Sequence, residues 1–269
     1  MIKIGFVDYY LDEWHATNYP GMLARASEEL GIPCEIVGAY AALDIPPHSG
    51  LRSTDEWCRE LGIKKYATIA SLAEACDSFL IFSPDNPEQH YPLAKAILPY
   101  GKPTFIDKTF AASYEDAKRI IELAKAHGTP MYSTSSLRYA AEIEGTRGSR
   151  VAAIEGNYVH MKDYLVHTGE MVVTVLGTGI STVTCRTEGE TYYFAVDYAD
   201  GRAATVKMAP DLPFKVNDCV VTSDFFGAQI ENILLFYSDK EPKVSYEEML
   251  EVATFIDLAT AAIKENEEK

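Results

Sequence analysis

Strand-like apolar runs and helix-like segments alternate through the first half of the chain, and this order constrains the fold most strongly. The first helix is expected over Asn18–Leu30, with Asn18 as its N-cap and Gly31 at its end. Ser71–Glu74 has a capping-box pattern that predicts the start of a short helix. The expected strands are Ile2–Val7, Cys34–Ala39, Phe79–Ser83, Thr104–Asp107 and Pro130–Ser133. This alternation predicts a parallel sheet with helices on both faces.

The second half of the chain reads mainly as strands. Asp200-Gly201 is typical of a hairpin turn, and a capping box at Ser245–Glu248 opens a final helix. The expected strands are Val151–His160, Thr182–Thr187, Thr191–Tyr198, Ala203–Met208, Cys219–Ser223 and Asn232–Ser238. We therefore predict an α/β protein: a Rossmann-like, doubly wound parallel sheet over residues 1–133, followed by a smaller α+β domain with a mostly antiparallel sheet over residues 134–269.

Charge and hydropathy exclude several classes of function. The chain has 40 acidic and 24 Lys or Arg residues, a net charge of −16, which disfavours nucleic-acid binding because phosphate contacts need positive charge. No window approaches the roughly 18 apolar residues of a membrane span. The five cysteines lack a zinc-binding spacing, and Asp8, Asp12 and His15 match no metal template. We therefore expect a cytoplasmic protein with no metal and no membrane contact.

A ligand site is expected where the parallel strands end, because open α/β sheets bind ligands at their carboxyl edge. The residues at these ends are Asp8-Tyr9-Tyr10, Ala39-Tyr40, Ser83-Pro84, Asp107-Lys108 and Ser133-Thr134.

Three segments resemble the Gfo/Idh/MocA family of oxidoreductases. That family has Glu-Lys-Pro at a strand end and an Arg-Tyr pair after the next strand, where this chain has Asp107-Lys108-Thr109 and Arg138-Tyr139. Upstream, FSPDNPEQH is similar to the family segment Thr-Pro-x-x-x-x-His. The third segment, KDYLVHTGEMVVTVLG, matches the spacing of the family helix Asp-x-Gly-x-His-x-x-Asp and its later glycine; the matching residues are Asp163, His167, Glu170 and Gly177, and Leu165 replaces the first glycine.

The resemblance implies hydride transfer between NAD or NADP and a sugar, polyol or related alcohol. Lys108 would exchange a proton with the substrate oxygen, and His167 would assist it, with Asp163 one turn earlier on the same helix face. Lysine and histidine suit this chemistry, because burial lowers a lysine pKa and histidine titrates near neutrality. The implied cofactor contacts are Ser83, Pro84, Asn86, His90 and Asp107. The implied substrate contacts are Arg138, Tyr139 and Glu170.

The resemblance also implies a homo-oligomer. In this family the C-terminal sheet often pairs with another subunit, so we expect a homodimer whose partner surface lies on the second domain.

The loop after the first strand departs from the family pattern. A dinucleotide site needs G-x-G-x-x-G there, so that the backbone can approach the pyrophosphate. This chain has no glycine from Phe6 to Pro20, and the second strand ends in Ala39-Tyr40-Ala41 without the acid that usually binds the adenosine ribose. The loop instead contains aromatic and acidic residues: Asp8, Tyr9, Tyr10, Asp12, Glu13 and Trp14.

Three functions therefore stay open from the residues. The first is a nicotinamide oxidoreductase with an unusual phosphate loop. The second is a cofactor-independent relative that catalyses a non-redox reaction, such as elimination or isomerisation, on a sugar-like molecule. The third is a binding or partner subunit that performs no chemistry.

Overall fold

The computed structural model describes residues 1–268, which form two compact units. Unit 1 contains Met1–Ser133 and Ile230–Val244. Unit 2 contains Thr134–Gln229 and the chain from Ser245 onward. The chain leaves unit 1 after Ser133, and residues 230–244 return to it. The predicted division into domains 1–133 and 134–269 stays a prediction.

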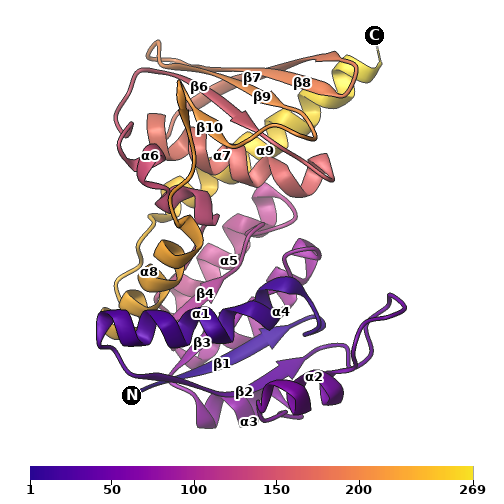
Figure 1. Ribbon diagram of the computed structural model, residues 1–269, viewed down its shortest axis with the longest axis vertical. Helices are drawn as coiled ribbons and strands as arrows, with labels where there is room; N and C mark the ends of the chain where they lie inside the picture. The colour runs from indigo at the N-terminus through magenta and orange to yellow at the C-terminus, as the bar shows by residue number, and fades with distance from the viewer. Residues whose placement is uncertain (269) are drawn as a thin grey trace. The chain divides into compact units, whose positions relative to one another are not determined.

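Unit 1 is built, within the described residues, on five parallel strands in the order β2-β1-β3-β4-β5 (Figure 1). The strands are β1 (Ile2–Asp8), β2 (Cys34–Ala41), β3 (Ser78–Ile81), β4 (Thr104–Ile106) and β5 (Met131–Ser133). Their near-continuous apolar sequences are typical of strands that are covered on both faces. The predicted doubly wound parallel sheet is therefore confirmed.

Adjacent residues of β1 show that helices cover both faces of this sheet. Gly5 faces Leu72 of α3, whereas the Phe6 ring packs against Phe82, which in turn contacts Tyr19 of α1. Successive side chains of a strand point to opposite faces, so α1 and α3 lie on opposite sides. The helices of this part are α1 (Trp14–Leu30), α2 (Thr54–Leu61), α3 (Ile69–Ala75), α4 (His90–Ile97) and α5 (Tyr114–His127), with the short 3-10 turns η1 (Pro87–Gln89) and η2 (Leu98–Tyr100).

The expected strand at Asn232–Ser238 is wrong, because these residues lie in helix α8 (Phe225–Asp239). Apolar and aromatic residues in this segment favour a strand by composition, but Ile230, Ile233, Leu234 and Tyr237 have the i, i+3, i+4, i+7 spacing of one helix face. All four are buried. The Tyr237 hydroxyl donates to the Phe79 carbonyl at 2.7 Å, which fixes the second half of α8 to unit 1.

Unit 2 contains, in the part of the chain that the structure describes, a six-stranded sheet of order β11-β10-β6-β9-β8-β7. Among the described strands of this sheet, only β6 and β9 pair in parallel, so the predicted mostly antiparallel sheet is confirmed. The strands are β6 (Val151–Gly156), β7 (Ile180–Glu188), β8 (Thr191–Tyr198), β9 (Ala203–Met208), β10 (Lys215–Val216) and β11 (Cys219–Val220).

Two long helices build the core of unit 2 with this sheet. They are α7 (Met161–Leu176) and α9 (Tyr246–Glu267), and their apolar residues share one buried cluster with β6, β8 and β9. The first part of the unit adds the 3-10 turn η3 (Ser136–Tyr139) and the short helix α6 (Ala141–Glu144). None of the helices within residues 1–268 has the length and apolar character to cross a membrane.

Replacing each of two helical glycines by alanine should change the stability of the protein in opposite directions. A Cβ atom on Gly169 of α7 would lie 2.6 Å from the Phe255 ring of α9, whereas a Cβ on exposed Gly21 of α1 meets no atom within 4 Å. We expect Gly169→Ala to lower the free energy of unfolding by about 1–3 kcal/mol through overpacking. Gly21→Ala should raise it by about 0.5–1 kcal/mol. Urea titration measures both, and equal responses would contradict the close contact of α7 with α9.

Candidate functional site

The carboxyl edge of the unit 1 sheet holds a buried acid at the end of β1. Asp8 accepts hydrogen bonds through Oδ1 from the Ser83 hydroxyl at 2.7 Å and from the Tyr9 N–H at 2.6 Å. Its Oδ2 atom is buried and has no partner among the described residues. Burial raises the pKa of Asp8 well above its usual value. Ser83 has a φ of 84°, a strained backbone conformation of the kind that concentrates at functional sites.

The raised pKa of Asp8 should make the free energy of unfolding depend on pH. Because its pKa is raised in the folded state, its contribution is fully present below the pKa of an unfolded aspartic acid and is lost as pH rises through the folded pKa. In Asp8→Asn this dependence disappears, since the amide does not ionise. The melting temperature of wild type should therefore fall relative to that of the variant as pH rises above the unfolded aspartic acid value of 3.8. Parallel melting curves for the two proteins over this range would contradict a buried, reluctantly ionised Asp8.

Asp107 follows β4 and forms an ion pair with His15 in the first turn of α1. The Tyr19 ring stacks on the His15 ring at a centroid distance of 5.3 Å. Burial opposes charge on Asp107, but His15 and Lys108 together lower its pKa below the usual value. The Lys108 N–H donates to Asp107 Oδ1 at 2.8 Å. Lys108, half-buried, therefore stands at the strand end next to an ionised acid.

The other predicted cofactor contacts surround the ends of β3 and β4. Ser83 and Pro84 are buried, and half-buried Asn86 precedes η1. His90 is fully buried, and its ring nitrogens lie against the backbone carbonyls of Phe82 and Thr109. Burial lowers the pKa of His90. His90 thus ties the end of β3 to the segment after Lys108, and its predicted cofactor contact stays a prediction.

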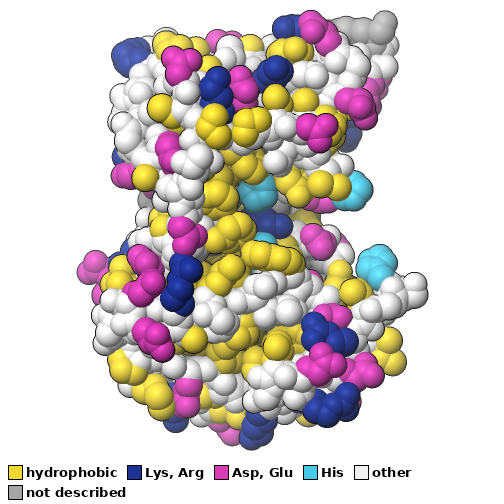
Figure 2. All heavy atoms as spheres, in the orientation of Figure 1, with side chains coloured by type: hydrophobic (Ala, Val, Ile, Leu, Met, Phe, Trp, Pro, Cys, Tyr) yellow, Lys and Arg dark blue, Asp and Glu magenta, His cyan; other side chains and the backbone are white. Residues whose placement is uncertain are grey.

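The loop between β1 and α1 does not fit the pyrophosphate of a nicotinamide dinucleotide. It has no glycine, its Tyr10 and Leu11 side chains are buried, and the carboxyl of Glu13 already accepts hydrogen bonds from the first N–H groups of α1. On the face drawn in Figure 2, acidic and basic side chains are interspersed among the described residues, and no continuous basic area appears. Nothing in this loop supplies the positive charge or the open backbone that a diphosphate requires.

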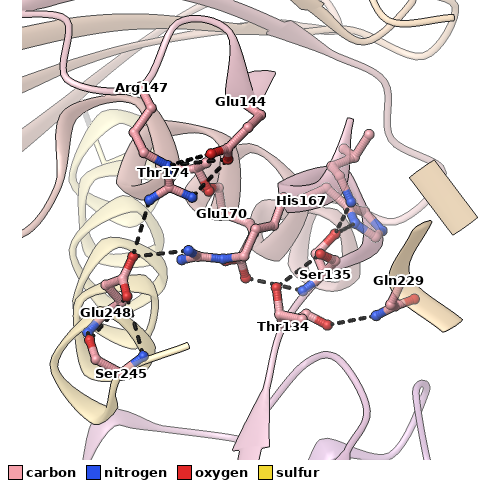
Figure 3. Close-up of polar contacts among 12 residues, drawn as sticks. Thr134, Ser135, Glu144, Arg147, His167, Glu170, Thr174, Gln229, Ser245 and Glu248 are labelled. Atoms are coloured by element: carbon pink, nitrogen blue, oxygen red, sulfur yellow. Dashed lines mark hydrogen bonds and ion pairs between the residues drawn. The ribbon is translucent and has the colours of Figure 1, made fainter. Parts of the chain in front are cut away.

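Unit 2 brings His167 of α7 next to Ser135, two residues after β5 (Figure 3). The Ser135 hydroxyl lies 2.8 Å from His167 Nδ1. The rings of Tyr164 and Phe214 contact the imidazole edge-on at centroid distances of 5.4 and 5.8 Å. Half-buried Asp163 lies one turn before His167, as the spacing predicted. Sequence reasoning did not identify Ser135, although it placed the neighbouring Ser133-Thr134 at a strand end.

A buried ion-pair network is linked to His167 through Ser135 (Figure 3). Arg138 Nε donates to Glu170, and Arg138 Nη1 donates to Glu248 at 2.9 Å. Glu170 also accepts from the Ser135 N–H at 3.0 Å. The predicted substrate contacts Arg138 and Glu170 are therefore already bonded to protein groups, and they position the segment that carries Ser135. Tyr139 ends η3 in the same segment.

The predicted residues thus form two groups, one in each unit. Lys108, Asp107, Ser83, Pro84, Asn86 and His90 belong to unit 1, and His167, Asp163, Glu170, Arg138 and Tyr139 belong to unit 2. The pairing of Lys108 with His167 stays a prediction. Within residues 1–268, no group of three His, Cys, Asp or Glu side chains has an arrangement that could hold a metal ion.

Comparisons with known proteins agree with this architecture. Residues 42–134 match the model of an oxidoreductase family with an NAD-binding Rossmann fold. None of the curated proteins compared with the chain matches it in sequence.

Solved structures with the same fold span nearly the whole chain. GenD2 from gentamicin A biosynthesis, solved with NAD, is 9% identical, with 98% of this chain and 94% of that chain covered and a TM-score of 0.75. UDP-N-acetylglucosamine 3-dehydrogenase GnnA from Acidithiobacillus ferrooxidans is 13% identical, with coverages of 97% and 96% and a TM-score of 0.71. An oxidoreductase from Agrobacterium radiobacter, solved with NAD⁺, L-tartaric acid and magnesium, is 14% identical, with coverages of 98% and 96% and a TM-score of 0.71. At these identities the comparisons show a shared fold.

Proposed function

We propose that this chain is an enzyme that moves protons on a small, hydroxylated, sugar-like molecule. The proposal starts from the match of residues 42–134 to the Gfo/Idh/MocA oxidoreductase family. Lys108 and His167 are the enzyme's two acid–base groups. One structural neighbour is a UDP-N-acetylglucosamine 3-dehydrogenase, and another was solved with L-tartaric acid, which agrees with a polyhydroxylated substrate class.

One observation carries this proposal: His167 is held by the Ser135 hydroxyl on a helix face whose next turn is anchored by the buried Arg138–Glu170 pair. A histidine with one ring nitrogen fixed by a hydrogen bond has a defined orientation for its other nitrogen. This is the arrangement that proton transfer requires, because a general base must be positioned before its pKa matters. Lys108, beside the ionised Asp107, supplies the second group.

The loop after β1 favours a reaction without a hydride acceptor. In an elimination, one group removes a proton from carbon while the other protonates the departing hydroxyl, so that water leaves and a carbon–carbon double bond forms. In an isomerisation, the same two groups shift a proton between neighbouring carbons and their oxygens. Neither reaction changes the overall oxidation state of the substrate, and neither needs a phosphate site.

Hydride transfer with a nicotinamide cofactor is the second candidate. The family model, described as NAD-binding, and the NAD complexes of two structural neighbours favour it.

A panel of aldoses, polyols and sugar acids tests the proposal. Each compound is incubated with wild-type protein in D2O, with and without NAD⁺ or NADP⁺, and followed by proton NMR and by the absorbance of reduced nicotinamide. Loss of a C–H signal or a new product without nucleotide supports the proposal. Turnover that requires a nucleotide supports the second candidate, and no turnover of any compound contradicts both.

A further inference from the structure

We propose that the Glu13 side chain occupies, within unit 1, the position at the N-terminus of α1 where a dinucleotide pyrophosphate would bind, so that this chain binds no dinucleotide through that helix. The inference concerns the residues of the loop alone and does not depend on the roles of Lys108 and His167.

Glu13 is the N-cap of α1, and its own carboxyl fills the anion-binding end of the helix. Its backbone is extended, with φ −132° and ψ 171°. Oε2 accepts from the His15 N–H at 2.6 Å, and Oε1 accepts from the Ala16 N–H. The first N–H groups of a helix lack partners within the helix and are the groups that bind phosphate in dinucleotide folds. Here those groups are bonded to a carboxyl of the same chain.

Hydrogen bonds to other segments hold both ends of the loop that carries Glu13. At its start, Asp8 is bonded to the Ser83 hydroxyl, and the Leu43 N–H donates to the Tyr9 carbonyl at 2.7 Å. Near its end, the Asp12 carboxylate accepts from the Arg52 N–H at 2.6 Å and from Arg52 Nε at 3.0 Å. These contacts hold the loop in the conformation that places Glu13 at the start of α1.

The charges around Glu13 oppose a diphosphate. Asp8 and Asp107 are near enough to Glu13 to raise its pKa, in addition to the larger effect of burial. Arg52, the cation fastened to this loop, is already bonded to Asp12 and Glu60. Asp8 is a further buried acid near Glu13, and in its ionised form it would repel a diphosphate.

Calorimetry on three proteins tests the proposal: wild type, Glu13→Ala, which removes the carboxyl, and Glu13→Asp, a matched control that keeps a capping carboxyl. The probes are NAD⁺, NADP⁺, ADP-ribose and inorganic pyrophosphate. We expect no binding heat for wild type or Glu13→Asp at ligand concentrations up to about 1 mM, and at least a tenfold gain in ADP-ribose affinity for Glu13→Ala, which corresponds to about 1.4 kcal/mol.

Three outcomes would overturn the proposal. The first is submillimolar binding of ADP-ribose to wild type that pyrophosphate displaces. The second is binding to Glu13→Asp as strong as that to Glu13→Ala. The third is a Glu13→Ala protein with a native circular-dichroism spectrum and no gain in affinity. Should Glu13→Ala not fold, the wild-type titration alone decides. These measurements do not depend on substrate turnover. A negative result would therefore count against the role of Glu13 without deciding the proposed acid–base function.

Discussion

Replacing His167 by alanine is expected to lower turnover of the substrate about 10²–10⁴-fold, the range over which a positioned general acid or base accelerates a reaction. Lys108→Ala should give a loss of the same order, because proton removal and proton donation need both groups. The rate constant is measured in the same NMR assay that identifies the substrate. Circular dichroism checks that each variant keeps the fold.

Two matched controls come from the same elements or residue types. His160 precedes α7 and is exposed, and Lys118 is an exposed lysine of α5. His160→Ala and Lys118→Ala should retain wild-type turnover. Ser135→Ala tests the positioning of the imidazole: it should shift the pH profile of kcat and reduce kcat less than His167→Ala does. Full activity in both His167→Ala and Lys108→Ala would show that the acid–base site lies elsewhere.

Arg138→Ala should produce the largest loss of stability, about 3–5 kcal/mol in the free energy of unfolding. Arg138 and Glu170 each have only 4% of the side chain exposed, and removing one partner of a buried pair leaves an uncompensated charge. Arg138 also lowers the pKa of Glu248 against the opposing effect of burial. A lowered carboxyl pKa contributes stability above the unfolded pKa, which is lost as pH falls. Below about pH 4.5 the difference between wild type and variant should therefore shrink.

Arg147→Ala is the control for this prediction, because the Arg147–Glu144 pair is exposed and such pairs contribute about 0–1 kcal/mol. The double variant Arg138→Met/Glu170→Leu removes both charges and should recover much of the loss, since apolar replacements of a buried pair are often neutral. Urea titration measures all of them. A loss in Arg138→Ala no greater than that in Arg147→Ala would contradict a buried structural role for this pair.

The strands of unit 1 could be predicted because each is a short, continuous apolar run between turn signals. A strand that is covered on both faces does not need alternating apolar and polar residues. The apolar runs of β1, β3 and β4 can therefore be recognised as strands from the sequence alone. The ends of α5 follow from local chemistry in the same way, because Ser113 is its N-cap and Gly128 its left-handed C-cap.

Two helix starts were predicted wrongly because the residue that caps depends on geometry beyond the local pattern. Asn18 lies inside α1, where its amide donates to the Trp14 carbonyl at 2.7 Å, and Glu13 is the N-cap. In α3, Thr68 rather than Ser71 is the N-cap. Both helices begin earlier than expected because Glu13 caps the N–H groups of His15 and Ala16, and Thr68 caps the N–H group of Ser71.

The site was predictable only in part, because its contacts join residues that are far apart in sequence. Spacing placed Asp163 and His167 on one helix face, and a strand end located Lys108. No sequence pattern joins His15 to Asp107, which lie 92 positions apart, or His167 to Ser135, which lie 32 apart. These pairs follow from the packing of α1 on the sheet and of α7 against η3, which only the folded structure provides.

The return of residues 230–244 to unit 1 affects when this unit can fold during synthesis. The Phe236 ring packs edge-on against Tyr132 at 5.0 Å, and Tyr237 is bonded to β3, so the first unit lacks part of its core until the ribosome has released Val244. A nascent chain that ends near Ser133 would hold a sheet with an uncovered aromatic patch. Unit 1 can therefore complete its core only after residues 230–244 have been synthesised.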